Sequence, residues 1–341
     1  MKVFRKIIKW LLMPIGGLLA LVLLAGLLFR LLAPAPQPPG ELVDIGEFSL
    51  HLKAVGERND QPTLVIESGA GAPSEYYYWL AEGLRDSMRV VRYDRAGIGY
   101  SELSEGPRDP ETVARELHTL LETSGESPPY IMAGHSYGGH YIRIFRELYP
   151  DEVVGLVFLD VPHPDESKRL NLPPGPQFMT ALYQVGAVIG DLGVLGLFDR
   201  TMGPILRAPG LPDTVTSRYV DYTLSGKYLW GYLDEEKWHP ELVNMAREAR
   251  DFGTTPVRVF AGTNLNEKAL IKMGVDPEFV RMERRKMQEE VAELSSNGKA
   301  FFLEGGHITI FSQKENADFI CQEILQLLGE LKEEKSMLTQ Q

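Results

Sequence analysis

Short apolar runs alternate along this chain with segments that have the periodicity of amphipathic helices. The runs at 63–66, 130–133 and 153–159 lack the polar alternation of a strand with one wet face. Between them, residues 112–123 and 137–149 repeat apolar side chains at helical spacing. Strands that are apolar throughout are buried on both faces, and helices between them supply that cover. The pattern predicts an α/β fold with a mostly parallel central sheet and helices on both faces.

The regular alternation begins and ends with recognisable segments. Two short alternating runs within 42–54 predict an antiparallel hairpin before the first buried strand. The rhythm stops at about 164–252, which is irregular and rich in Pro and Gly, and it resumes with strands at 257–260 and 300–303. We therefore expect a domain over 42–330 with a helical insertion after its sixth strand, placed as a lid at the carboxyl edge of the sheet.

The N-terminal segment differs from the rest of the chain. Residues 10–29 form a run of 20 without a charge, preceded by four basic residues, and as a helix this run is about 30 Å long. A cleaved signal peptide is the alternative, but its apolar core is normally about 7–15 residues, and here Arg30 follows a longer one. We expect residues 1–32 to be a cytoplasmic stub and a single-pass anchor in the cell membrane. The positive-inside rule then puts the body on the non-cytoplasmic side.

Composition excludes several classes of function. The net charge of -12 and the lack of a basic patch argue against nucleic-acid binding. Cys321 is the only cysteine, so an internal disulfide and a cysteine zinc site are impossible, and its apolar setting predicts a buried core position. We expect no metal or organic cofactor. Residues 33–41 are rich in Pro and predict a stiff spacer, and residues 331–341 predict a polar tail.

The strongest local motif is Gly134-His135-Ser136-Tyr137-Gly138, which follows a predicted strand and opens a predicted helix. A sharp turn there forces strained backbone geometry on Ser136, and side chains two residues before and after it would collide. The turn lifts the Ser136 hydroxyl above the sheet. The segment therefore predicts a nucleophilic serine.

This motif, together with the glycine-containing turn at 93–101, resembles the α/β-hydrolase superfamily, and the likeness covers roughly residues 42–330. The resemblance implies the α/β-hydrolase fold and the group that carries a lid between its sixth and seventh strands. The serine at the nucleophile position excludes the branches of the superfamily that use an aspartate there. We interpret the turn at 93–101 as structural.

A serine hydroxyl needs a base, and the resemblance implies His307. His307 follows Gly305-Gly306 between the last strand and the last helix, where the family places its base. The other six histidines lie outside this loop. Among them, His163 is the alternative base, because it stands near a candidate acid.

A third group, an acid, should orient the base, and the sequence offers several acidic residues for this role. Most of the family takes it from the loop after the seventh strand, but here residues 262–267 hold no aspartate, and Glu267 is the acidic residue available. A smaller part takes it from the end of the sixth strand, where Asp160 stands. A charge ending an apolar strand requires a partner, so we predict Asp160, with Glu267 and Asp165 as alternatives.

Acyl transfer also requires two N–H groups for the developing oxyanion. The resemblance implies the amide of Tyr137, directly after the nucleophile, and that of Ala70 in the turn after the third strand. Ser68 replaces the family's usual histidine in that turn, so Gly71 stays open as an alternative donor.

The resulting expectation is a membrane-anchored serine hydrolase that cleaves a carboxylic ester through a Ser-His-Asp triad and an acyl-enzyme. Aromatic residues of the insertion favour a small, hydrophobic ester as substrate. Hydrolysis of an amide or carbon–carbon bond would use the same residues. A non-catalytic binding protein on the same scaffold is the alternative from another class.

Overall fold

A computed structural model describes residues 2–173, 178–203 and 207–339. Its centre is one eight-stranded sheet in the order β1-β2-β4-β3-β5-β6-β7-β8, with β1, β2 and β4 antiparallel and the remaining pairs parallel. The strands are β1 (Glu41–Asp44), β2 (Ser49–Val55), β3 (Thr63–Glu67), β4 (Val90–Tyr93), β5 (Tyr130–His135), β6 (Val153–Leu159), β7 (Val257–Gly262) and β8 (Gly298–Leu303). The predicted mostly parallel sheet, entered through an antiparallel hairpin, is confirmed.

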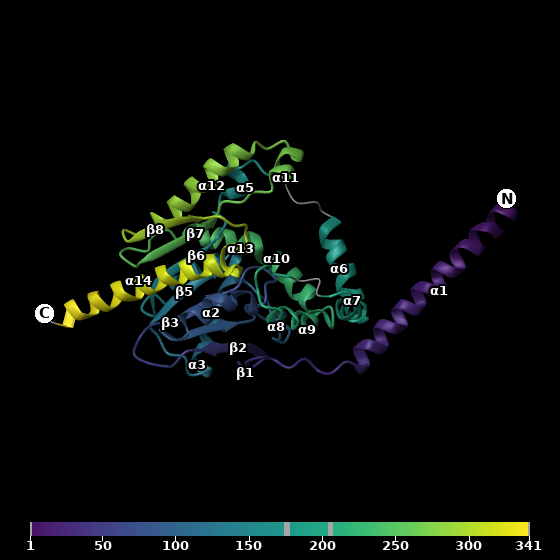
Figure 1. The fold of residues 1–341 in the computed structure, drawn as a ribbon, viewed down its shortest axis with the longest axis horizontal. Helices are drawn as coiled ribbons and strands as arrows, with labels where there is room; N and C mark the ends of the chain where they lie inside the picture. Colours follow the sequence, from purple (N-terminus) through teal and green to yellow (C-terminus); the bar gives the residue numbers. More distant parts are fainter. Residues whose placement is uncertain (1, 174–177, 204–206, 340–341) are drawn as a thin grey trace.

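Helices cover both faces of this sheet (Figure 1). Those of the body are η1 (Ser74–Tyr77), α2 (Tyr78–Leu84), α3 (Pro110–Thr123), α4 (Tyr137–Leu148), α11 (Glu267–Lys272), α12 (Pro277–Ala292), α13 (Thr309–Ser312) and α14 (Lys314–Thr339). Helices α3, α4 and α12 share one apolar core with the sheet, and α2, α13 and α14 share the other. The second core contains Cys321, which is buried as predicted.

In the described part of the chain between β6 and β7, six helices stand at the position predicted for the insertion. They are α5 (Glu166–Arg169), α6 (Phe178–Asp191), α7 (Val194–Met202), α8 (Asp213–Thr216), α9 (Tyr219–Thr223) and α10 (Lys227–Glu248). Helices α6 and α7 meet at an angle of 81°. Residues 174–177 and 204–206 of the predicted insertion lie outside the described residues.

The N-terminal run folds as one helix, α1 (Lys2–Leu32), which extends away from the body (Figure 1). Within the described ranges, its residues Leu12–Leu32 are the one helix long and apolar enough to cross a membrane, or one of two if the bent α6 and α7 count as a broken span. Residues 34–38 then run without regular structure into the body.

The C-terminal segment is helical. Residues 331–339, predicted as a polar tail, continue helix α14 to Thr339. Their Lys, Glu, Met and Leu are strong helix formers. The helix therefore continues beyond the residues whose apolar side chains pack against the body.

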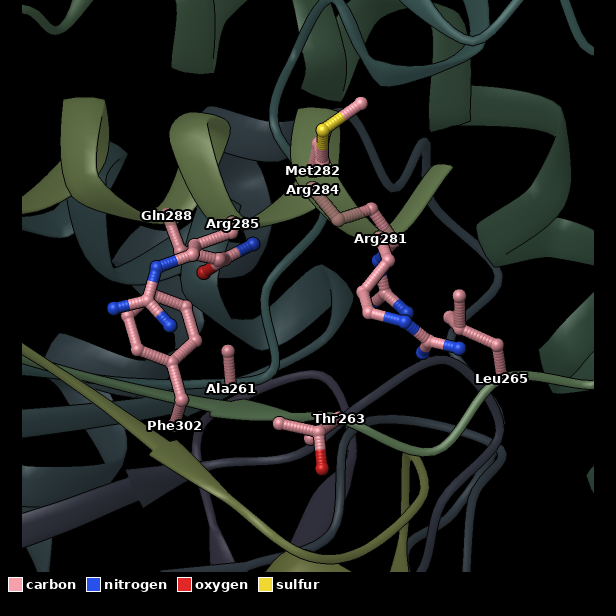
Figure 2. A pocket seen from close by; sticks show the side chains of 10 residues that line it. Ala261, Thr263, Leu265, Arg281, Met282, Arg284, Arg285, Gln288 and Phe302 are labelled. Atoms are coloured by element: carbon pink, nitrogen blue, oxygen red, sulfur yellow. The ribbon is translucent and has the colours of Figure 1, made fainter. Parts of the chain in front are cut away.

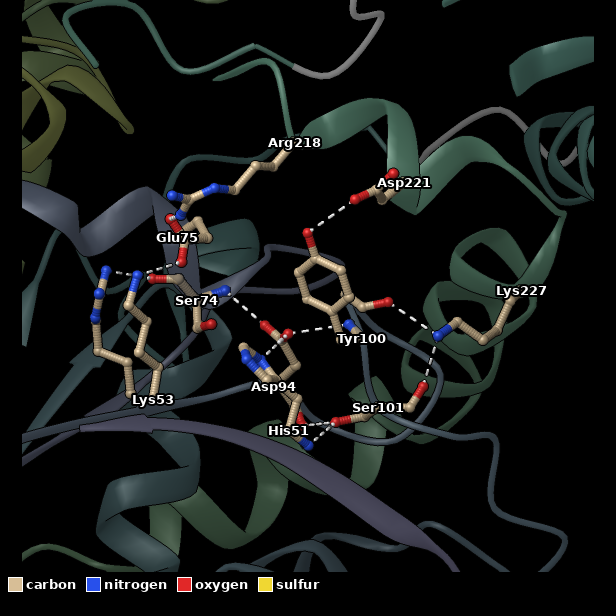
Figure 3. A network of polar contacts seen from close by, with 12 residues as sticks. His51, Lys53, Ser74, Glu75, Asp94, Tyr100, Ser101, Arg218, Asp221 and Lys227 are labelled. Atoms are coloured by element: carbon tan, nitrogen blue, oxygen red, sulfur yellow. Dashed lines mark hydrogen bonds and ion pairs between the residues drawn. The ribbon is translucent and has the colours of Figure 1, made fainter. Parts of the chain in front are cut away.

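The turn after β4 is held by a polar network, in agreement with its structural interpretation (Figure 3). The Asp94 carboxylate accepts from the amides of Ser74 and Tyr100 and contacts the buried His51 ring at 2.7 Å. Lys227 of α10 donates to the carbonyls of Gly99 and Ser101. The network therefore fixes the start of α10 against the sheet edge.

Candidate active site

Ser136 stands on the sharp turn between β5 and α4. Its backbone has φ 53° and ψ -122°, a region that non-glycine residues rarely adopt. A Cβ at Gly134 would lie 2.5 Å from the carbonyl carbon of Gly138, and one at Gly138 would lie 2.2 Å from the carbonyl oxygen of Glu67. Both glycines are therefore required for this turn, as the sequence predicted.

Ser136, Asp160 and His307 line one cavity of about 330 Å³. They come from the ends of β5 and β6 and from the loop after β8, because parallel strands bring their carboxyl ends to one edge of the sheet. The other lining residues are Pro162, Glu166, Asn264, Leu265, Asn266 and Arg284. Among the described residues, no group of three His, Cys, Asp or Glu side chains is arranged to hold a metal ion.

Asp160 and His307 are directly hydrogen-bonded, with 2.7 Å between Oδ2 and Nδ1. Asp160 is 2% exposed and also accepts from the Gly262 amide at 2.9 Å. Burial raises the pKa of Asp160, but the hydrogen bond from His307 and the charge of Arg284 outweigh it and lower that pKa to about 2. An ionised Asp160 can only accept, so His307 carries its proton on Nδ1 and leaves Nε2 free to act as a base.

The alternative acids have other partners. Glu267 opens α11 and accepts from Arg281 at 2.8 Å, with more than half of its side chain exposed. Asp165 accepts from Arg247 at 3.0 Å. His163, the competing histidine, accepts from the Asp165 amide through Nδ1. None of these groups is bonded to His307.

The two amides predicted for the oxyanion come from different elements. Tyr137 is the first residue of α4, where an amide has no acceptor within the helix. Ala70 lies in the turn after β3, whose Gly69 would place a Cβ 3.2 Å from the Ser136 Cβ. The Gly71 amide is already donated to Glu235 at 2.8 Å, so it is the weaker candidate.

A sequence profile described as the alpha/beta hydrolase family matches residues 64–322, most of the chain. The chain belongs to this family. The bovine (Lyso)-N-acylphosphatidylethanolamine lipase is 31% identical over 162 residues, which are 46% of this chain and 45% of the lipase. The matched regions of this and other curated relatives span between 21% and 53% of those proteins' own length.

Solved structures share the fold of this alpha/beta hydrolase. A putative lipase from Acinetobacter baumannii superposes with a TM-score of 0.59 at 15% identity, covering 86% of this chain and 92% of the lipase. The enol-lactonase from Burkholderia xenovorans superposes with a TM-score of 0.58 at 17% identity, covering 85% of this chain and all of the lactonase. At these identities the likeness shows the fold alone.

Arg284 is a member of this site that sequence reasoning missed. Its guanidinium reaches Asp160 at 3.3 Å and Glu166 at 3.6 Å. It also lines a neighbouring pocket beside β7 and β8, together with Arg281 and Arg285 (Figure 2). Arg284 lies on α12, and no local sequence pattern indicates that this helix reaches the end of β6.

A buried arginine connects the turn after β3 to the insertion in this hydrolase. Arg95, 2% exposed, bonds to Glu67 of β3 and to Glu235 of α10, the latter at 2.7 Å. It also donates to the carbonyls of Ser68 and Gly69. Glu235 also accepts from the Gly71 amide. The Arg95 guanidinium is therefore linked to both ends of the turn after β3, directly at Ser68 and Gly69 and through Glu235 at Gly71.

His135, which precedes Ser136 in the motif, joins three parts of the site. Its Nε2 donates to the His307 carbonyl at 3.0 Å, so its Nδ1 accepts from the Tyr77 hydroxyl at 3.0 Å. That hydroxyl accepts from the Gly69 amide. Burial, and then the nearby His307, lower the pKa of His135 well below 6.5, so the ring stays neutral and this bonding pattern persists.

His140 on α4 provides a prediction about pH. It is buried, neither ring nitrogen has a partner in the described chain, and burial followed by Arg143 lowers its pKa well below 6.5. The unfolded chain takes up this proton below pH 6.5 and the folded chain does not, so stability is lost as pH falls from 6.5. His140→Leu should therefore stabilise the protein by up to about 1.4 kcal/mol more at pH 5.5 than at pH 8. Urea unfolding at both pH values measures this, and an equal effect at the two would contradict it.

Proposed function

We propose that this alpha/beta hydrolase is a serine hydrolase that cleaves carboxylic esters through Ser136, His307 and Asp160. The observation that carries the proposal is the 2.7 Å bond between His307 and Asp160 in the cavity that Ser136 lines. A buried carboxylate that fixes one tautomer of a histidine, beside a serine on a strained turn, is the arrangement that nucleophilic catalysis requires.

The residues have distinct roles in the proposed reaction. Nε2 of His307 takes the Ser136 proton while Oγ attacks the ester carbonyl, and Asp160 stabilises the cationic ring that results. The amides of Ala70 and Tyr137 donate to the oxyanion. His307 then protonates the leaving alcohol, and in the second half it activates water, which releases the acid and restores the Ser136 hydroxyl.

Two observations favour an ester as substrate. One curated relative is named a lipase, and two solved structures with this fold are named a putative lipase and an enol-lactonase. These names refer to enzymes that act on ester bonds. The insertion between β6 and β7 supplies aromatic rings next to the site, with Tyr137 stacked on His239 of α10 at 4.4 Å. We therefore infer a small-molecule substrate that is a hydrophobic ester.

We also propose that α1 anchors the protein in the cell membrane with the hydrolase domain on the non-cytoplasmic side. Leu12–Leu32 is long and apolar enough to span the bilayer, and the basic residues lie on its N-terminal side. Mass spectrometry of the mature N-terminus tests this proposal. A chain that begins near Pro36 would contradict it and identify a signal peptide.

The proposed chemistry is tested by turnover of p-nitrophenyl esters of increasing acyl length. Ser136→Ala should lower kcat/KM by about 10⁴-fold or more, because the nucleophile and the bond that it forms are lost. Ser87→Ala, at an exposed serine in the turn after α2, is the matched control and should leave the rate unchanged. Equal rates for the two variants would overturn the proposal.

A further inference from the structure

Helices α6 and α7 present apolar side chains to the outside of the protein. Helix α6 carries no charged residue before its last position, Asp191. A helix of that composition is normally covered by protein or by lipid, and apolar patches of this kind mark interaction sites. The exposed apolar side chains of the two helices are Phe178, Leu182, Val185, Val188, Phe198 and Met202.

Packing inside the insertion fixes which face of α6 points outward. Ala187 is fully buried, and a Cβ at Gly190 would lie 2.8 Å from the Cα of Gly226. The Tyr183 ring packs edge-on against Tyr232 of α10, with 5.2 Å between centroids. Residues 182, 185 and 188 fall on the opposite side of the helix at helical spacing. Their exposure therefore follows from how α6 is held against α10.

The proposed membrane span reaches this same pair of helices (Figure 1). A Cβ at Gly26 of α1 would lie 2.8 Å from the Leu192 carbonyl oxygen, and a Cβ at Gly196 would lie 2.9 Å from the Phe29 ring. Arg30 pairs with Asp191 at the bend between α6 and α7. Gly26 precedes the end of α1 by six residues, or roughly 9 Å of helix. The bend therefore contacts α1 at a depth that belongs to the outer leaflet.

We propose that the exposed face of α6 and α7 inserts into the outer leaflet of the membrane that α1 crosses. The substrate is then an acyl ester of a membrane lipid, received from the bilayer and not from water. The ester chemistry in this inference rests on the proposed function, and the position of α6 and α7 at the membrane rests on the proposed span of α1. The occupant of the apolar face is lipid, because the face is continuous with a helix whose own surface is apolar and almost entirely exposed.

The inserted helix is connected to the proposed oxyanion turn by direct contacts. Tyr183 of α6 packs on Tyr232 of α10, and a Cβ at Gly71 would meet the Tyr232 ring at 3.0 Å. Glu235, one turn along α10, holds the Gly71 amide. Helix α6 therefore packs against the element that carries both Gly71 contacts, which places the proposed lipid-facing helix next to the site.

The depth of α6 can be measured on the full chain in phosphatidylcholine nanodiscs. An NBD fluorophore at Val185→Cys, in a Cys321→Ala background, should show blue-shifted emission and quenching by doxyl-labelled lipids. Met337→Cys is the matched control, because Met337 is equally exposed but lies on α14, at the end of the molecule far from α1 (Figure 1). Quenching equal to that of the control overturns the proposal. A blue shift without lipid quenching, which grows with protein density, assigns the face to a second copy and overturns it also.

The substrate arm compares two esters. In Leu182→Glu/Val185→Glu, hydrolysis of a long-chain ester in vesicles should fall at least tenfold, while p-nitrophenyl acetate hydrolysis stays within twofold. Met337→Glu should change neither, and flotation checks that α1 retains every variant on the vesicles. Equal effects on the two esters overturn the inference. If the wild type hydrolyses no ester, the proposed function fails, and the depth measurement still decides whether the face is inserted.

Discussion

Asp160→Asn is expected to lower kcat for ester hydrolysis by about 10⁴-fold while the fold persists. An amide in that position can donate to Nδ1 of His307, which favours the tautomer with its proton on Nε2. That tautomer cannot accept the Ser136 proton, and the cationic ring also loses the charge that stabilises it. Steady-state kinetics on a p-nitrophenyl ester measures the loss.

The matched control is Glu267→Gln. Glu267 is the acidic residue in the segment after β7, from which most of the family takes its acid. Glu267 is exposed and paired with Arg281, so its replacement should leave kcat within about twofold. Loss of activity in Glu267→Gln with full activity in Asp160→Asn would reverse the assignment. Circular dichroism of both variants separates a catalytic loss from unfolding, since Asp160→Asn also removes the partner of Arg284.

Arg95→Met is expected to lower the free energy of unfolding by about 3–5 kcal/mol. The substitution leaves the carboxylates of Glu67 and Glu235 buried without their shared cation, and the carbonyls of Ser68 and Gly69 lose their donors. Removal of one member of a buried charge network is costly for this reason. Because the oxyanion turn loses its support, ester turnover should fall as well.

Urea unfolding of the full chain in detergent measures the change in stability. The control is Arg115→Met, which breaks an exposed pair with Glu111 on α3 and should cost no more than about 0.5 kcal/mol. Similar losses of stability in the two variants would show that the Arg95 network contributes no more than a surface pair.

The parts of the site that belong to strand ends were predictable from sequence. Ser136 and Asp160 each follow an apolar run, and the carboxyl ends of parallel strands meet at one edge of a sheet. The glycines around Ser136 are required by a local backbone constraint that needs no knowledge of the rest of the fold. These features are encoded in short segments, so periodicity and motif spacing predicted where the residues stand, and the resemblance to the family supplied their predicted roles.

Residues that arrive from distant elements were not predictable. Arg284 contacts Asp160 across 124 positions, and Arg95 contacts Glu235 across 140. The sequence around Arg284 is typical of a solvent-exposed helix face, and the sequence around Arg95 is typical of a structural turn. Neither local pattern indicates a distant partner. His135 was missed for another reason, because the motif constrains only its glycines and serine, whereas the hydrogen-bond partners of this ring come from η1 and the loop after β8.

The nucleophile is tested most directly by a fluorophosphonate probe with mass spectrometry of the labelled peptides. The full chain in detergent should gain one adduct, on the peptide that contains Ser136, and Ser136→Ala should gain none. Asp160→Asn should label far more slowly, because its His307 no longer takes the proton. A folded wild type that stays unlabelled, or that carries the adduct on another serine, would contradict the account.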